Sequence, residues 1–129
     1  MKIHKGDIAI EMLEDTIRMH LGGHYISSFH LAAAASELLS GLSEINGFKG
    51  AHRNLKEMMK DFHDSNPSFF SKPKDALKRF NSPKNAIKHI NGENDQYVYL
   101  SPEHQSKMYI GQCQRMLEEN FGMCLLGNI

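Results

Sequence analysis

Residues 29–39 read Phe-His-Leu-Ala-Ala-Ala-Ala-Ser-Glu-Leu-Leu and lie inside a longer helical pattern that spans about 24–45. Apolar side chains recur along two stripes of this helix. The first stripe holds Leu31, Ala35, Leu38, Leu42 and Ile45, and the second holds Phe29, Ala32, Ala33 and Leu39. A helix that is apolar on most sides packs at the centre of a bundle. This stretch therefore predicts an all-α fold built around its second helix.

Helical periodicity continues on both sides of this stretch. Four further helices are expected over about 5–21, 51–63, 73–90 and 102–121. Asp7 is the expected N-cap of the first helix, and Ser101 followed by Pro102 is a typical start for the last. Pro83 should interrupt the fourth helix and restart it. The predicted fold is an antiparallel bundle of four to five helices, forming a single domain over 1–129.

Composition excludes several classes of protein. The chain of 129 residues has a formal net charge of zero, so a nucleic-acid binder that works by bulk charge is excluded. No apolar run approaches the ~20 residues of a membrane span, and the first residues form no apolar signal segment. A cytoplasmic protein without a membrane contact is expected. Cys113 and Cys124 would lie ~16 Å apart along one helix, which is too far for a disulfide and favours two small buried apolar residues.

The eight histidines raise the question of a metal site. His20 and His24 have the spacing of a helical zinc pair, but Gly22 and Gly23 between them should break the helix. Glu-x-x-His and Cys-x-x-Cys motifs are both absent. We therefore expect neither a metal site nor another cofactor.

Residues 72–89, here called the basic segment, concentrate positive charge. They carry six cations against the single acid Asp75, and the cations are Lys72, Lys74, Lys78, Arg79, Lys84 and Lys88. Two interpretations stay open at this point. The segment is either a surface for phosphate or nucleic acid, or a solvated helix face that complements the acidic face of the first helix.

Lys84-Asn85-Ala86-Ile87-Lys88-His89 closes the basic segment. Asn85 and His89 are four residues apart and would share one helix face, within reach of Lys84. A neutral His89 takes a proton from a hydroxyl while Lys84 offsets charge on a phosphate. A helix restarting at Pro83 would add free backbone amides, which favour an anion.

Two motifs resemble a known group of proteins. Tyr25 to Gly41 resembles the central helix of small, uncharacterised bacterial HEPN-like proteins, which carry a Leu-Ala-Gly-Ala-Ala-Glu-Glu-like stretch there. Lys84 to His89 resembles the Arg-Asn-x-x-Lys-His motif of the same group. The resemblance covers most of the chain and implies an antiparallel helical bundle, with a homodimer whose interface holds the motif.

The resemblance also implies roles for single residues. In HEPN ribonucleases, an Arg, a polar residue and a His act together in RNA cleavage without a metal ion. Lys84, Asn85 and His89 match these three positions, and Glu37 matches an acidic position on the central helix. Lys74, Lys78, Arg79 and Lys88 are the expected binding cations around them.

Two functions follow from this resemblance. The first is a non-catalytic interaction module that binds RNA, a nucleotide or a protein partner. The second is a metal-independent, toxin-like ribonuclease that uses Lys84, Asn85 and His89. Lysine lacks the bidentate fork of arginine and holds a phosphate only as a point charge, which favours the first function.

Overall fold

The computed structural model describes residues 1–65 and 73–125, and five helices account for most of them. The helices are α1 (Lys5–Leu21), α2 (Tyr25–Ile45), α3 (Ala51–Ser65), α4 (Pro73–Ala86) and α5 (Pro102–Phe121). No strand occurs among the described residues, so the all-α prediction is confirmed. The chain divides into two compact units, Met1–Ala51 with Ser101–Ile129 and His52–Leu100, and each is described here by itself. A single domain over 1–129 stays a prediction.

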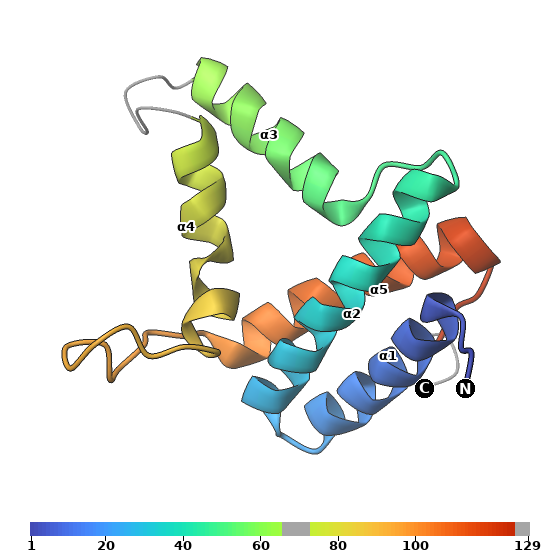
Figure 1. Ribbon diagram of the computed structural model, residues 1–129, viewed down its shortest axis with the longest axis horizontal. Helices are drawn as coiled ribbons and strands as arrows, with labels where there is room; N and C mark the ends of the chain where they lie inside the picture. Colours follow the sequence, from blue (N-terminus) through green and yellow to red (C-terminus); the bar gives the residue numbers. More distant parts are fainter. Residues whose placement is uncertain (66–72, 126–129) are drawn as a thin grey trace. The chain divides into compact units, whose positions relative to one another are not determined.

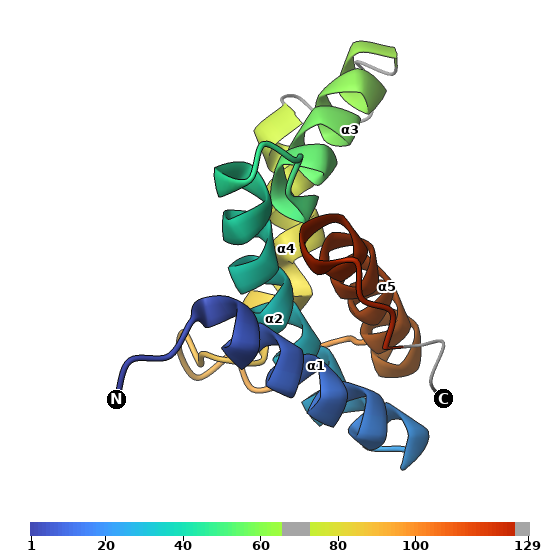
Figure 2. The same ribbon diagram turned by 90° about the vertical axis from the view of Figure 1, so that its right-hand side faces the viewer.

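The first unit consists of α1, α2 and α5, which pack side by side (Figures 1 and 2). The Ser28 hydroxyl on α2 donates to the Thr16 carbonyl on α1 at 2.9 Å, close to the short turn that joins these antiparallel helices. Between α2 and α5 the contacts advance in the same direction, from Ala32–Cys113 to Ser43–Asn120. These two helices therefore run parallel to each other.

The core of the first unit lies where α2 meets its two neighbours. Its largest fully buried apolar side chains are Phe29, Leu13, Leu39, Met116 and Leu117. The rings of Phe29 and Tyr109 stack with their centroids 5.6 Å apart and an interplanar angle of 13°. Close packing of α5 on α2 also brings the Cys113 thiol to the Ala32 carbonyl, at 3.4 Å. The small alanine side chains of α2 allow this close approach.

The second predicted stripe of α2 is buried throughout, but the first is not. Ala35 is fully buried, Leu31, Leu38 and Leu42 are half-buried, and Ile45 is 82% exposed. Leu21 and Phe121 also proved exposed, although the periodicity of α1 and α5 predicts them in the core. All three exposed residues lie at the last position of a helix, where neighbouring helices cover the side chain only in part.

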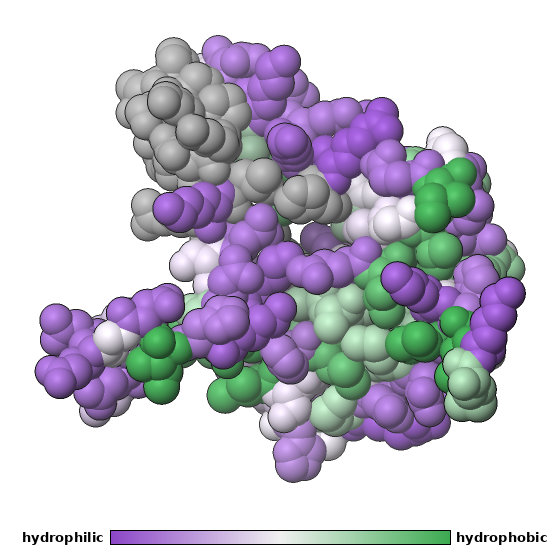
Figure 3. Space-filling view, in the orientation of Figure 1, coloured by the Kyte–Doolittle hydropathy of each residue, from purple (hydrophilic) through white to green (hydrophobic). Residues whose placement is uncertain are grey.

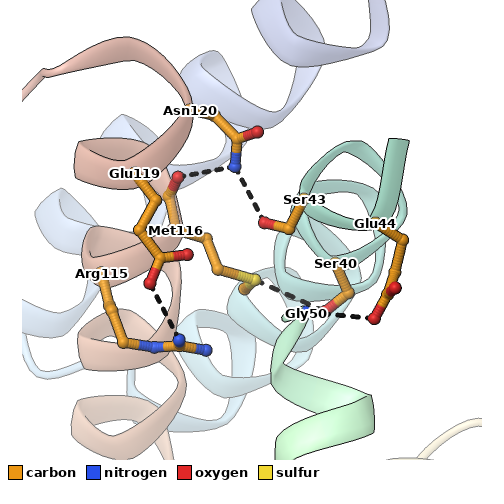
Figure 4. A network of polar contacts seen from close by, with 8 residues as sticks. All are labelled: Ser40, Ser43, Glu44, Gly50, Arg115, Met116, Glu119 and Asn120. Atoms are coloured by element: carbon orange, nitrogen blue, oxygen red, sulfur yellow. Dashed lines mark hydrogen bonds and ion pairs between the residues drawn. The ribbon is translucent and has the colours of Figure 1, made fainter. Parts of the chain in front are cut away.

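Side-chain hydrogen bonds connect the C-terminal halves of α2 and α5 (Figure 4). The Asn120 amide donates to the Ser43 hydroxyl and to the Met116 carbonyl, both at 2.8 Å. Beyond α2, the Gly50 N–H donates to the Glu44 carboxylate at 3.2 Å. These contacts fix the end of α2 and the chain that leaves it.

Two local predictions about helix ends were wrong. The N-cap of α1 is His4, whose Nδ1 accepts from the Gly6 N–H at 2.9 Å, and Asp7 lies in the first turn instead. Gly122, with a φ of 65°, ends α5, so Cys124 lies beyond the helix and is exposed rather than buried. Both thiols are free, as predicted, and Cys113 is buried.

The second unit holds most of α3, all of α4 and the stretch 87–100, which contains no helix. Gln96–Leu100, whose alternation suggests an extended connector, is neither helix nor strand. No helix among the described residues of either unit combines the length and the apolar composition that a membrane crossing requires.

Candidate nucleic-acid interface

The basic segment lies mainly on α4 and on the residues that follow it. Lys78 is exposed on the helix, and Lys88 and His89 are exposed beyond its end. Lys72, and the side chains of Lys74 and Arg79, lie outside the part of the chain that the structure describes. From 76 to 92 the sequence holds the cations Lys78, Arg79, Lys84 and Lys88 and no acid.

Helix α4 does not restart at Pro83, and this part of the prediction is wrong. Pro83 lies inside α4, which continues for three residues and ends at Ala86. The Lys88 N–H then donates to the Asn85 carbonyl at 3.1 Å, which closes a turn. Pro83 supplies no N–H to the preceding turn, and the chain leaves the helix soon after it.

This helix end changes the electrostatics predicted around Lys84. Lys84 and Asn85 lie in the last turn of α4 and not in the first turn of a new helix. A helix C-terminus presents carbonyl groups and the negative end of the dipole. The helix dipole therefore favours Lys84 itself and gives no support to an anion at this position.

Asn85 and His89 do not share a helix face. Asn85 is helical and exposed, whereas His89 follows the turn at Ile87 and Lys88. Lys84 is half-exposed beside Asn85. The structure thus keeps these residues in one short exposed stretch but does not give them the helical geometry on which the cleavage mechanism depends.

Glu37 is exposed on α2 and belongs to the first unit. Its negative charge acts on the buried Tyr109 of α5: burial, and to a smaller extent Glu37, raise the pKa of that phenol to about 12. Burial alone raises the pKa of the Cys113 thiol to about 12. Both groups are therefore neutral and structural at ordinary pH. Sequence periodicity predicts the burial of Cys113 but no effect of Glu37 on Tyr109.

A shallow groove of about 600 Å³ lies in the first unit where α2 and α5 begin. Tyr25, His104 and Lys107 line it, together with Glu103, which pairs with Lys107 at 3.5 Å. Outside its lining, His20 of α1 hydrogen-bonds Ser106 of α5, whose hydroxyl also donates to the Glu103 carbonyl. Ser106 is fully buried, so this pair joins α1 to α5 and offers no accessible nucleophile.

Metal-ligating side chains do not gather anywhere in residues 1–65 and 73–125. No group of three His, Cys, Asp or Glu residues in these ranges lies close enough together to hold an ion.

Two exposed tyrosines in the second unit were not among the predicted site residues. Tyr97 is 91% exposed and Tyr99 is fully exposed. From the sequence, Tyr97 is one of the apolar residues expected at a dimer interface, whereas the alternation in Gln96–Leu100 predicts an extended chain but no role for Tyr99.

Comparison with known proteins adds no further assignment. The chain matches no protein family, no curated protein and no solved structure.

Proposed function

We propose that the protein is a non-catalytic interaction module that binds RNA through the basic segment. The observation that carries this proposal is the exposure of Lys78, Lys88 and His89 along a stretch that holds four cations and no acid. The rest of the chain balances this charge, so the positive potential is local to the segment. Neutralised phosphates release counterions, and this supplies most of the affinity of a nonspecific RNA contact.

The end of α4 supports binding over cleavage. A metal-independent ribonuclease needs a base within hydrogen-bond reach of the attacking hydroxyl and a cation fixed at the phosphate. His89 follows a turn and is exposed, so no helix fixes its position relative to Asn85. Lys84 lacks the arginine fork that would hold a phosphate at two points.

A binding assay tests the proposal. We expect a fluorescent 12-nucleotide RNA to bind at low salt and to lose about tenfold in affinity in the double variant Lys78→Gln/Lys88→Gln. The variant should also show a shallower dependence of affinity on salt. Lys2→Gln/Lys5→Gln removes two exposed lysines at the start of the other unit and is the matched control. Absence of binding at 50 mM salt, or an equal loss in the control, would refute the proposal.

The same RNA, incubated with the protein in the presence of a chelator, tests the ribonuclease alternative. We expect the RNA to remain intact. Cleavage that persists with the chelator and disappears in His89→Ala would replace the proposed function with the ribonuclease.

A homodimer is part of the proposal, although the surface expected for it has changed. Tyr109 is buried, whereas Leu21, Ile26 and Ile45 expose apolar surface in the first unit. The residues expected at the interface from the sequence are Tyr25, Phe69, Phe70, Tyr97, Tyr109, Leu125 and Leu126. Of the others in this set, Tyr97 is exposed in the second unit, Tyr25 and Leu125 are half-buried, and Phe69, Phe70 and Leu126 lie outside the described residues. Apolar surface without a cover is typical of an interface. Sedimentation velocity over a range of protein concentrations, with and without phosphate, tests for the dimer, and a strict monomer would exclude it.

A further inference from the structure

Tyr97 and Tyr99 are more exposed than any other aromatic residue of the described chain, at 91% and 100%. Residues 97–100 contain no helix, turn or bend. Within the described ranges, no hydrogen bond involves the backbone or side chains of these four residues. Among the described residues of the second unit, no group therefore holds the two rings by a hydrogen bond, and both rings are open to solvent.

Only Val98, which is 44% exposed, separates the two tyrosines. Their Cα atoms are therefore at most ~7 Å apart, whatever the local backbone conformation. The segment thus presents two successive aromatic faces to solvent.

A closed loop brings this segment near the end of the basic segment. The Asn91 N–H donates to the Asp95 carboxylate at 2.8 Å, and the Asp95 N–H donates to the Gly92 carbonyl at 3.1 Å. His89 precedes the closure by two residues and Tyr97 follows it by two. The loop lies at the left of Figure 3, where its surface is mainly hydrophilic with one hydrophobic patch. Cations and tyrosines are therefore adjacent within one unit.

We infer that Tyr97 and Tyr99 stack on unpaired bases of a single-stranded RNA whose phosphates contact Lys88 and the other cations of the basic segment. This inference rests on the proposed function and names its ligand class. Lysines that follow the backbone, combined with aromatic rings for the bases, are typical of proteins that bind single strands without sequence preference. A duplex keeps its bases inside the helix and cannot offer them to the rings.

The charges around the tyrosines favour RNA over a protein partner. Exposed tyrosines are also common at protein interfaces, but four cations without an acid precede this loop. The loop carries two acids that oppose a phosphate: the exposed Glu93, and Asp95, whose carboxylate accepts a hydrogen bond from the Asn91 N–H but keeps its negative charge. Replacing Glu93 by Gln should therefore strengthen RNA binding about two- to threefold at low salt.

Three probes with similar numbers of phosphates test the inference: a 24-nucleotide uridine oligomer, a 12-base-pair RNA duplex and a chain of inorganic polyphosphate of matching length. We expect wild-type protein to bind the oligomer at least tenfold more tightly than polyphosphate, which has no bases. The variant Tyr97→Leu/Tyr99→Leu should lose this preference and bind both alike. Tyr97→Phe/Tyr99→Phe keeps the aromatic faces and is the matched control, so it should bind the oligomer as wild type does.

The outcomes separate this inference from the proposed function. The stacking inference is wrong if all three probes bind equally and the leucine variant behaves as wild type does. In that case the proposed function stands, and the tyrosines become a candidate surface for a protein. If no probe binds, the proposed function fails and the inference fails with it. A phenylalanine variant as weak as the leucine variant would also overturn stacking, because the hydroxyl groups would then carry the contact.

Discussion

Glycine residues have opposite effects on stability at two positions of the first unit. A Cβ at Gly50 would lie 2.8 Å from the Ser40 carbonyl oxygen, in the backbone of α2, which cannot move aside easily. At Gly41, in the middle of α2, a Cβ meets nothing within 4 Å. We expect Gly50→Ala to lower the free energy of unfolding by about 1–3 kcal/mol and Gly41→Ala to raise it by ~0.5–1 kcal/mol. Urea denaturation measures both, and equal effects would contradict the close approach at Gly50.

The buried Tyr109 and Cys113 side chains of α5 should make the stability of the protein depend on pH in the alkaline range. The pKa values of Tyr109 and Cys113 rise to about 12 in the folded protein, from 10.0 and 9.0. The folded state therefore keeps protons that the unfolded state loses between these values. Their contribution to stability is complete below pH 9 and is lost progressively as the pH rises towards 12.

The variant Tyr109→Phe tests this prediction, because it keeps the ring and removes the ionisable hydroxyl. The unfolding free energy of the wild-type protein should fall between pH 8 and pH 11. We expect the fall in this variant to be smaller than in wild type by ~1 kcal/mol or more. Tyr97→Phe makes the same change at an exposed position and is the matched control for loss of a hydroxyl group. Identical pH curves for Tyr109→Phe and wild type would contradict the assignment.

Residue types alone identified the cations of the candidate interface but not its geometry. The clustering of positive charge from Lys78 to Lys88 is visible in the sequence, and the structure exposes both of these side chains. The relation between Asn85 and His89 depends on where α4 ends. The end of a helix is set by several small local energies that oppose one another, and the spacing of residues in the sequence does not show which of them is larger. The exposure of Tyr97 and Tyr99 depends on what packs nearby, which no local pattern specifies.

At the scale of single helices, strong local signals gave the most accurate predictions. The residues Gly22-Gly23 and Ser101-Pro102 mark the end of α1 and the start of α5, and the structure places these boundaries as predicted. Pro83 is an equally clear signal that α4 is interrupted nearby, but a proline does not determine whether a new helix begins after it. The parallel course of α2 and α5 follows from the path of the intervening chain, so no periodicity within either helix could predict it.

Removing Pro83 should extend α4. Alanine at this position restores an N–H donor for the preceding turn and removes the ring that crowds it. We expect Pro83→Ala to increase the helical signal in circular dichroism, to slow amide exchange over residues 84–90 and to stabilise the protein by about 1 kcal/mol. Pro102→Ala is the control, because proline at the start of α5 replaces no needed donor and its removal should bring no such gain. Unchanged exchange at 84–90 would show that Pro83 is not what ends the helix.

At the scale of the whole molecule, the first unit is assembled from both ends of the chain, with the second unit inserted between them. α5 contributes Cys113, Met116 and Leu117 to the core against α1 and α2, so its attachment does not depend on the loop that precedes it. Among the aromatic residues that the structure describes, chymotrypsin, which cuts after such residues, should cleave first at Tyr97 or Tyr99. Both are exposed and make no hydrogen bond, whereas Tyr109 is only 6% exposed.

The two fragments of this cleavage should remain together on gel filtration and separate only in denaturant. The reason is that the fully buried apolar contacts of α5 span the cut and require no covalent link. Mass spectrometry identifies the cleavage sites, and Tyr97→Ser/Tyr99→Ser should slow the first cut without changing later ones. Separation of the fragments under native conditions would mean that α5 is held by the chain connection and not by its packing in the first unit.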